Sequence, residues 1–294
     1  MGTKHATFAV MPPRPQTAAG SAAGLAGWMV VPHTAPRLTI DLKLIGWVAA
    51  LTLLATAATA ATTPGAPRSA FEVIATWWPL LLKGFLYNLL ISAAAMVIGT
   101  AVGVPLGILQ TSKLVPARRL AWGVTQFFRN SPWLVLLFLC MFLLPFQIRI
   151  FGYVIPLPDY TKAILGFALP VMANVSEIVR GAIQSVPTSQ WESAESLGFS
   201  RRQTLFEIIL PQCVKRMLPP WMNLYSLITM STVNASVVGV SEMITLTNDV
   251  LAAEGSRPAL LAPLYGFALV CFFLYCYPIA RWTQSLERRF IVKG

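Results

Sequence analysis

Residues 84–112 read GFLYNLLISAAAMVIGTAVGVPLGILQTS, a stretch without any charged side chain between Lys83 and Lys113. A helix needs about 20 apolar residues to cross the hydrocarbon core of a bilayer. The stretch is long enough for one such span, and too long and uninterrupted for a barrel strand of about 10 alternating residues. Within it, Gly99 and Gly103 have the GxxxG spacing that lets two helices pack closely, although small residues are also simply common in membrane helices.

Further windows of low charge occur along the chain and predict additional spans. They lie near residues 44–62, 131–148, 162–183, 218–240 and 259–280. Together with a span near 86–110, they predict an all-α integral membrane protein with about six transmembrane helices. The composition agrees, because 56% of the 294 residues are hydrophobic and only 11% are charged, whereas soluble domains carry about 25% charged residues.

The net charge of +11 indicates how these spans are oriented. With six spans, the polar segments alternate between two sides, and one side holds 17 of the 22 basic residues. The other side holds Arg68, Lys83, Arg149, Lys162 and Arg257. The positive-inside rule places the strongly basic side, and with it both termini, in the cytoplasm. A basic excess can also indicate nucleic-acid binding, but this one flanks apolar spans, so we expect no nucleic-acid partner.

The remaining segments predict neither a metal site nor a catalytic site. Residues 1–40 are rich in Ala, Pro, Gly and Thr, which predicts a disordered cytoplasmic tail before an extra N-terminal transmembrane helix at 41–66. The four cysteines lack metal-ligand spacing, and both histidines lie in the tail. The phosphate-binding pattern G-x-x-x-x-G-K-[ST] is absent, so any ATP hydrolysis must come from another chain.

The most informative loop, residues 186–211, connects the fourth and fifth predicted spans on the basic side. It reads VPTSQWESAESLGFSRRQTLFEIILP and predicts two short helices separated by a turn. The residues expected to cap and end them are Thr188 or Ser189 and Gly198 for the first helix, and Ser200 and Pro211 for the second. A short helical pair on the cytoplasmic side is typical of a docking element for a soluble partner.

Within this loop the residues Glu192, Ser193, Ala194, Gly198, Ile208, Leu210 and Pro211 stand at a characteristic spacing. The spacing resembles the pattern E-A-A-x3-G-x9-I-x-L-P of inner-membrane permease subunits in bacterial ABC importers, with Ser193 in place of the usual Ala. The resemblance implies the type I ABC importer transmembrane-domain fold over residues 80–292. It also implies that the loop is a coupling helix and that these residues contact an ATPase.

Other motifs resemble the polar amino-acid uptake type of these permeases. They are Gly84-x-x-x-Asn88-Leu89 for G-x-x-x-T-L, Phe128-Arg-Asn-Ser-Pro-Trp-Leu-Val135, and Glu177-Ile-Val-Arg180-Gly181. The implied cargo is an amino acid, polar or charged, although Met230 replaces a basic residue that is common in the family. The implied partners are two ABC ATPase subunits that bind ATP and Mg, a second permease copy or related permease, a periplasmic solute-binding protein, and membrane lipid. No cofactor is expected on this chain.

Polar residues inside the fourth and fifth spans are candidates for the translocation path. The candidates are Asn174, Glu177, Asn223, Ser226, Thr229, Thr232 and Ser236. Such residues can line a path for a zwitterion, but they can equally form hydrogen bonds between helices. Glu177 and Arg180 share a helix face, and this pair could alternatively lock the fourth span to the 186–211 loop.

Two other classes of protein compete with an ATP-driven importer. A secondary transporter or channel that works without ATP would need charge inside its spans and often has inverted repeats. Glu177 is the one acid inside a predicted span, and no repeat is visible. A membrane enzyme would need His, Asp or Cys clusters, which the spans lack. The sequence therefore favours the permease subunit of an amino-acid importer in the bacterial inner membrane, with the 186–211 loop as its link to ATP.

Overall fold

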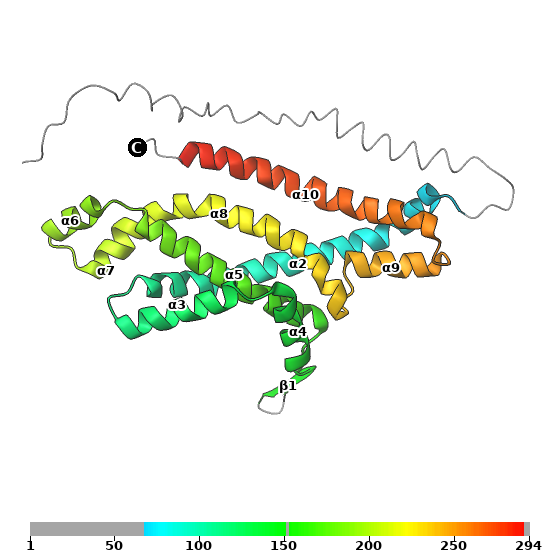
Figure 1. Ribbon diagram of the computed structural model, residues 1–294, viewed down its shortest axis with the longest axis horizontal. Helices are drawn as coiled ribbons and strands as arrows, with labels where there is room; N and C mark the ends of the chain where they lie inside the picture. Colours follow the sequence, from blue (N-terminus) through cyan, green and yellow to red (C-terminus); the bar gives the residue numbers. More distant parts are fainter. Residues whose placement is uncertain (1–67, 151–152, 291–294) are drawn as a thin grey trace, which may run out of the picture. The chain divides into compact units, whose positions relative to one another are not determined.

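The computed structural model describes residues 68–150 and 153–290 and is built mainly from helices (Figure 1). The α-helices are α2 (Ala70–Gln110), α3 (Val115–Arg129), α4 (Trp133–Leu143), α5 (Asp159–Gln184), α6 (Thr188–Ser196), α7 (Arg201–Gln203), α8 (Leu210–Ser231), α9 (Met243–Ala253) and α10 (Leu261–Phe290). The π-helical turn η2 (Thr204–Ile209) and the 3-10 turns η3 (Thr232–Val238) and η4 (Pro258–Leu260) connect some of them. The predicted tail at 1–40 and the predicted helix at 41–66 lie outside the described residues.

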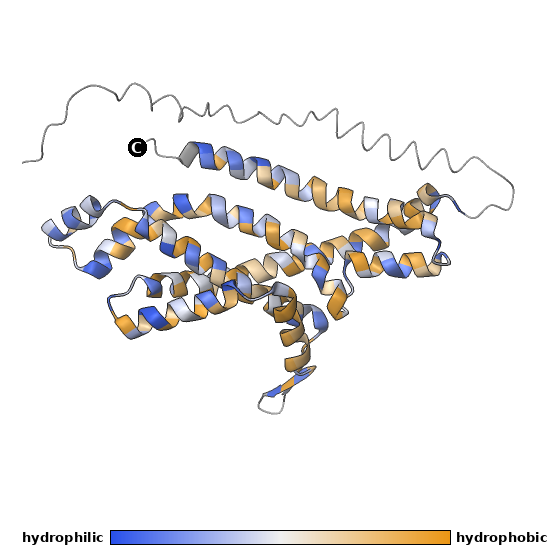
Figure 2. Cartoon of the chain, in the orientation of Figure 1, coloured by the Kyte–Doolittle hydropathy of each residue, from blue (hydrophilic) through white to orange (hydrophobic). Residues whose placement is uncertain are grey.

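Three helical segments are long and apolar enough to cross a membrane, namely Ala70–Gln110, Asp159–Gln184 and Pro258–Arg288. Two bent pairs also qualify if each counts as one span. One pair is α3 with α4, and the other is Arg201–Val238 with α9. The described residues thus hold up to five spans, and the fold is a mostly helical membrane protein as predicted. Figure 2 shows that apolar residues dominate α4, whereas the last part of α10 is largely hydrophilic.

Helix α2 is longer than the predicted span near 86–110, because it begins at Ala70. Ser69 and Glu72 form a capping box at its start. The Glu72 N–H donates to Ser69 Oγ at 3.3 Å, and the Ser69 N–H donates to Glu72 Oε2 at 3.0 Å. These bonds satisfy N–H groups that the first helical turn leaves free. The helix therefore begins well before the predicted span and includes Lys83.

The region of the predicted span near 131–148 is bent rather than straight. Helix α4 has 11 residues, about 16 Å of helix, which is roughly half the thickness of the hydrocarbon core. Helix α3 lies between the predicted spans near 86–110 and 131–148, and it meets α4 at 98°. Pro132 lies between them, where it lacks an N–H and disfavours helical geometry in the residue before it. The bend therefore follows from this proline.

A small β-hairpin connects α4 to α5 and was not predicted. Strands β1 (Gln147–Ile150) and β2 (Tyr153–Pro156) are antiparallel, with Ile148 opposite Ile155 and Arg149 opposite Val154. Each strand has only four residues, too few for alternation to stand out beside the adjoining apolar helices. The expectation of an all-α chain therefore holds for the membrane helices but not for this connection.

Helices α2 and α5 pack closely along a row of glycines. Gly99, Gly103 and Gly107 stand four residues apart on α2. A Cβ atom at Gly103 would lie 2.6 Å from the Met172 carbonyl oxygen, and one at Gly107 would lie 2.6 Å from the Ser176 carbonyl oxygen. These separations are too short for any side chain, so glycine is required for the two backbones to approach. The GxxxG interpretation is confirmed, and it extends one turn further to Gly107.

Candidate coupling loop and intramembrane polar clusters

The loop at 186–211 begins with α6, whose first residue is Thr188. The predicted cap at Thr188 or Ser189 is wrong, because Pro187 occupies the N-cap position and no side chain makes a capping bond there. Proline suits the start of a helix because its fixed φ is compatible with the first turn and its missing N–H would have no partner there. This helix therefore starts on backbone geometry alone.

The turn after α6 depends on Gly198, as the sequence predicts. Gly198 has a φ of +82°, its N–H donates to the Glu195 carbonyl at 2.9 Å, and the Phe199 N–H donates to the Ala194 carbonyl at 3.1 Å. This pair of bonds is the Schellman arrangement, which ends a helix on a left-handed residue and favours glycine. The chain thus reverses sharply at Gly198.

The second segment starts at Ser200 and does not end at Pro211. Ser200 and Gln203 form a capping box, which confirms the predicted start. The predicted end is wrong, because the helix continues through η2 into α8. In the π-helical turn the Leu210 N–H donates to the Leu205 carbonyl, and Pro211 follows in the first turn of α8. The wider π turn accommodates the proline ring and its missing N–H, so the helix is not interrupted.

The sequence-predicted coupling residues fall on two faces of this loop. Glu192, Ser193, Gly198 and Pro211 are exposed, Ile208 and Leu210 are half-buried, and Ala194 is buried. Of the inward-facing ones, Ile208 and Leu210 pack against an apolar core that includes Val179 and Ile209. The exposed ones are accessible to another chain. The motif therefore contains residues that pack inside the protein and residues that can contact a partner.

Two exposed apolar residues of the same loop were not predicted as contact residues. Leu197 is 76% exposed at the turn and Phe206 is 51% exposed in η2. Large apolar side chains at a loop surface mark interaction sites when they lie together with polar groups. The position of Leu197 directly before the helix-ending Gly198 is the signal that could have revealed it, because no following turn covers it.

The loop is attached to both helices that flank it. Ser185 caps the end of α5, and Arg216 on α8 donates from Nη1 to the Ser185 carbonyl oxygen at 2.6 Å and to Ser185 Oγ at 2.8 Å. A cation at the C-terminal end of a helix satisfies free carbonyls there. Movement of the loop would therefore act on α5 and α8 together.

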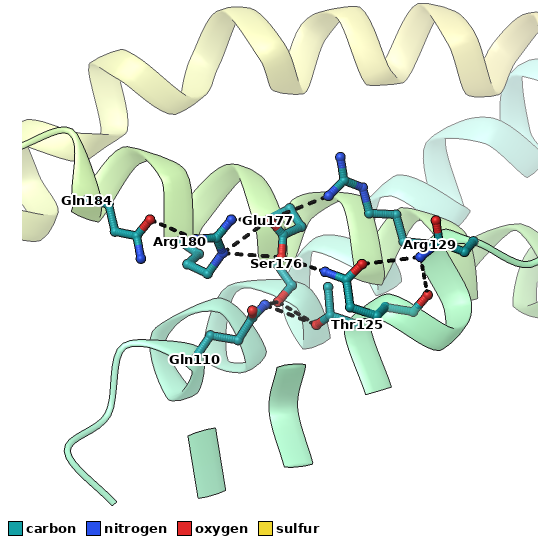
Figure 3. Close-up of polar contacts among 9 residues, drawn as sticks. Gln110, Thr125, Arg129, Ser176, Glu177, Arg180 and Gln184 are labelled. Atoms are coloured by element: carbon teal, nitrogen blue, oxygen red, sulfur yellow. Dashed lines mark hydrogen bonds and ion pairs between the residues drawn. The ribbon is translucent and has the colours of Figure 1, made fainter. Parts of the chain in front are cut away.

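Glu177 lies in a charged cluster between α5 and α3 (Figure 3). The Arg180 guanidinium donates to it twice from Nε at 3.2 Å and once from Nη2 at 2.6 Å. From α3, Arg129 Nη1 and Gln126 Nε2 each lie 3.5 Å from a Glu177 oxygen. Arg180 also donates to Gln184 at 2.7 Å. We call these five residues the α3–α5 cluster. It joins α5 to α3, so the alternative that Glu177 and Arg180 lock α5 to the 186–211 loop is not what the contacts support.

Next to this cluster, three buried neutral side chains join α2, α3 and α5. Gln110 Nε2 donates to Ser176 Oγ at 2.6 Å and to Thr125 Oγ1 at 3.1 Å, and the two hydroxyls lie 3.1 Å apart. We call them the Gln110 triad (Figure 3). Asn174 belongs to neither group, because its Nδ2 donates to the Pro170 carbonyl of its own helix at 2.8 Å. The triad was not predicted, since its members are far apart in the sequence.

A second polar cluster lies where α2, η3 and α9 meet, and each of its three side chains is fully buried. Asn88 Nδ2 donates to Thr232 Oγ1 at 2.9 Å and to Glu242 Oε2 at 2.8 Å, and the Met243 N–H donates to Asn88 Oδ1 at 3.1 Å. We call Asn88, Thr232 and Glu242 the α2–α9 cluster.

Glu242 also caps the N-terminus of α9. Its Oε1 accepts from the Ile244 N–H at 2.9 Å and from the Thr245 N–H at 3.0 Å. The span prediction had placed Glu242 in an outer loop and left Glu177 as the one acid among the spans. Glu242 does lie in the non-helical connection before α9, but its side chain has no exposed surface, which the span prediction did not anticipate. The charge-free windows could not find it, since α9 is short and the segment before it is polar.

The polar residues of the fifth predicted span do not form one continuous stripe. Asn223 is exposed, Ser236 is half-buried, and Ser226, Thr229 and Thr232 are buried. The 3-10 turn η3 has three residues per turn instead of 3.6, so Ser236 leaves the line set by α8. Thr232 bonds to α2, whereas buried Ser226 Oγ has no hydrogen-bond partner among the described residues. Hydrogen bonding between helices thus accounts for Thr232 but not for Ser226.

Comparison with known proteins identifies the family. The family described as binding-protein-dependent transport system inner membrane component matches residues 100–292. A probable amino-acid ABC transporter permease protein of Bacillus subtilis is 35% identical over 214 residues, which cover 72% of this chain and 90% of that protein. The L-cystine transport system permease protein of Bacillus subtilis is 27% identical over 73% of this chain and 88% of its own length. A probable glutamine ABC transporter permease protein of the same organism is 28% identical, covering 71% and 93%.

Solved structures share the fold. The crystal structure of an amino acid ABC transporter with histidines superposes with a TM-score of 0.64 at 24% identity, covering 75% of this chain and 98% of that one. An inward-facing methionine ABC transporter gives a TM-score of 0.54 at 14% identity, covering 72% and 98%. At these identities the likeness concerns the fold alone.

The family shows in what kind of complex the chain works. Its members are inner-membrane, multi-pass components without a bound cofactor, and they act in complexes with ATPase subunits and a binding protein. The part of the chain that the structure describes has no group of three or more His, Cys, Asp or Glu side chains that could hold a metal ion. The chain therefore belongs to the binding-protein-dependent permeases and is the membrane subunit of an amino-acid ABC importer, in which a separate subunit hydrolyses ATP.

Proposed function

We propose that the 186–211 loop is the docking element for the ATPase, with Glu192, Ser193 and Gly198 at the contact and Leu197 as its apolar anchor. The observation that carries this proposal is the exposure of Leu197 at the turn of a loop whose other side is packed into the core. An exposed apolar side chain surrounded by polar groups suits a partner surface better than water. The inward-facing Ala194, Ile208, Leu210 and, at the base, exposed Pro211 hold the loop in shape.

The complex that we infer contains two ATPase subunits, which bind ATP and Mg, and a second permease, either a copy of this chain or a relative. The loop and both termini face the cytoplasm, and a solute-binding protein delivers cargo on the other side. The distribution of basic residues supports this orientation. Figure 1 shows α6 and the C-terminal end of α10 at the same end of the helices, which agrees with the loop and the end of α10 lying on one side. Residues 80–292 form the permease core.

We further propose that the cargo, a polar or charged amino acid, passes along α8 and η3. Ser226 supports this path, because a buried hydroxyl without a partner is available to a ligand. Asn223 and Ser236 continue the polar surface on either side, while Thr229 and Thr232 shape the segment. The names of the cystine and glutamine permeases among the relatives agree with a polar amino acid. Asn174 and Glu177 lie on α5 and are assigned a supporting role.

The docking proposal is tested with Glu192→Lys and Leu197→Asp in the complex purified with its ATPase. Both changes place an unfavourable charge at the contact, so we expect at least about tenfold weaker ATPase association, or about 1.4 kcal/mol. Substrate-dependent uptake should fall in parallel. The matched control is Asp249→Lys, which makes the same charge change at an exposed site on α9.

Gly198→Val adds a second, independent variant. A Cβ atom at this position meets nothing within 4 Å inside the chain, so the substitution acts through the left-handed backbone or through the partner surface. If the Glu192 and Leu197 variants retain ATPase binding and uptake at the level of the Asp249 control, the docking assignment is wrong.

The proposed cargo path is tested separately with Ser226→Val, which should reduce uptake while ATPase association is retained.

A further inference from the structure

The β-hairpin between α4 and α5 has one face without hydrophilic side chains, which we call the apolar face, and an opposite face that holds its hydrophilic residues among apolar ones, which we call the polar face. Successive side chains of a strand point to opposite faces of a sheet. The pairing of Ile148 with Ile155 and of Arg149 with Val154 therefore puts Ile148, Ile155 and Tyr153 on one face. The other face carries Gln147 and Arg149 together with their apolar partners Pro156 and Val154. The apolar face is open, because Ile148, Tyr153 and Ile155 are 37%, 78% and 48% exposed. Such a face is costly to leave in water.

The connections to the hairpin keep it near the membrane surface. Residues 144–146 link it to α4, and residues 157–158 link it to α5. A four-residue strand is only about 13 Å long, at about 3.3 Å per residue. The hairpin therefore remains close to the points where two membrane helices end, and Figure 1 shows it beyond the end of α4 and well apart from α6 and α7.

The apolar face of the hairpin continues the outer surface of α4. Val135, Leu139, Phe142 and Leu143 are exposed along that helix, which is apolar throughout in Figure 2. Exposed apolar residues on a membrane helix face lipid. Phe146, which is 75% exposed, links this surface to the hairpin, so one apolar surface extends from the helix onto the strands.

The base of the hairpin is held by a buried lysine. Lys162 on α5 is fully buried, and its ammonium lies 3.6 Å from the centroid of the Phe146 ring. A cation over an aromatic face is attracted by the negative charge density of the ring, more strongly when water is excluded. Asp159 Oδ1 lies 3.7 Å away on the same helix. The hairpin is thus oriented on α5 by a fixed contact.

We propose that this hairpin is a membrane-interface element that rests its Ile148–Tyr153–Ile155 face in the bilayer surface on the side away from the 186–211 loop. The ligand is the lipid boundary itself. Tyr153 supplies an amphipathic ring of the type enriched at that depth, and Arg149 on the opposite face can reach anionic headgroups. The arrangement is the two-stranded counterpart of an amphipathic helix lying in the interface. It is independent of the coupling and cargo assignments.

The test measures the depth of both faces in the same protein. Single cysteines replace Ile155 or Tyr153 on the apolar face and Arg149 or Gln147 on the polar face, and each carries a nitroxide label. The full chain, purified with its ATPase, is placed in vesicles of phosphatidylethanolamine and phosphatidylglycerol. Collisions with dissolved oxygen, which concentrates in lipid, are compared with collisions with a water-soluble nickel chelate. The parent chain, taken through the same labelling, gives the background from the native cysteines.

We expect the ratio of oxygen to nickel collisions to be several-fold higher at the Ile155 and Tyr153 positions than at the Arg149 and Gln147 positions. Equal access of nickel to both faces would mean that the hairpin stands in water, where a soluble binding protein could contact it, and would overturn the proposal. Exclusion of both reagents from the apolar face would mean that another protein chain covers it, as a second permease could, and would overturn it equally. Lys162→Met provides a second check, because it should reduce the difference between the faces while the complex stays assembled.

Discussion

The molecule contains two polar clusters that each surround a glutamate, and the partners that stabilise the glutamate differ: arginines in one cluster and neutral groups in the other. In the α3–α5 cluster, Glu177 is held by Arg129 and Arg180, whose side chains are 47% and 31% exposed. In the α2–α9 cluster, Glu242 is fully buried, and within the described residues no Lys or Arg forms an ion pair with it. Its partners are the Asn88 amide and two N–H groups at the start of α9.

The difference follows from access to solvent. Arginines at the edge of the α3–α5 cluster keep part of their hydration while neutralising Glu177, so little desolvation is needed. A fully buried cation beside Glu242 would have to lose its hydration as well. The N–H groups of the Asn88 amide and of the first turn of α9 carry partial positive charge. They can stabilise the negative charge of Glu242 without a second ion. We therefore expect the loss of one partner to lower the free energy of unfolding more in the α2–α9 cluster than in the α3–α5 cluster.

The largest effect is expected for Asn88→Leu. This change removes the donor to Glu242 and Thr232 and the acceptor of the Met243 N–H at once. A buried polar group that loses its hydrogen-bond partner destabilises a protein by about 1–3 kcal/mol, and by more when the group is charged. Thermal unfolding of the purified chain in detergent should therefore shift strongly to lower temperature, and the yield of folded protein should fall.

Two matched variants make this prediction discriminating. Asn88→Thr keeps one hydroxyl that can donate and accept, so we expect a loss smaller than that of Asn88→Leu. Asn223→Leu removes the same type of side chain from an exposed position on α8, and it should change unfolding by less than about 0.5 kcal/mol. Equal unfolding temperatures for the Asn88→Leu and Asn223→Leu proteins would contradict the role assigned to the α2–α9 cluster.

The two clusters also differ in how far the sequence reveals them. Glu177 and Arg180 are three residues apart in one helical span, so their pairing can be read from helix geometry. Asn88 and Glu242 are far apart in the sequence, and only the packing of α2 against α9 brings them together. A search for charge-free windows finds long, continuous spans. It ends the fifth predicted span before Glu242, because α9 is a short helix that follows a break in the chain.

The same distinction applies to the coupling loop and to the hairpin. Gly198 and Ser200 act through their own local backbone, and both were predicted. Pro211 was misjudged, because a proline usually ends a helix, and only the π-helical turn before it allows the helix to continue. The hairpin and the exposure of Leu197 were missed, since both depend on which surfaces the folded helices leave uncovered.

A smaller effect is expected for Glu177→Gln. The amide keeps the shape of the side chain but loses its charge, and the two arginines remain partly hydrated. Ion pairs of this exposure contribute about 1 kcal/mol or less, so the unfolding temperature should fall modestly. The difference from the parent chain should shrink further at high salt, because mobile ions screen exposed charges. A loss that is independent of salt would mean that Glu177 is as isolated from water as Glu242.

The smallest effect is expected for Ser176→Ala in the Gln110 triad. The change removes the hydroxyl that accepts from Gln110 and contacts Thr125, but the direct bond from Gln110 to Thr125 at 3.1 Å remains. Hydrogen bonds between membrane helices average about 0.6 kcal/mol, so we expect a loss of that order. Ser193→Ala is the control, because the Ser193 hydroxyl donates only within its own helix, to the Ser189 carbonyl. The two losses of unfolding free energy, for Ser176→Ala and for Asn88→Leu, should therefore differ clearly. If they were similar, hydrogen bonds between neutral side chains would stabilise this fold as much as the bonds of the buried carboxylate do. Solvent access would then not explain the contrast between the clusters.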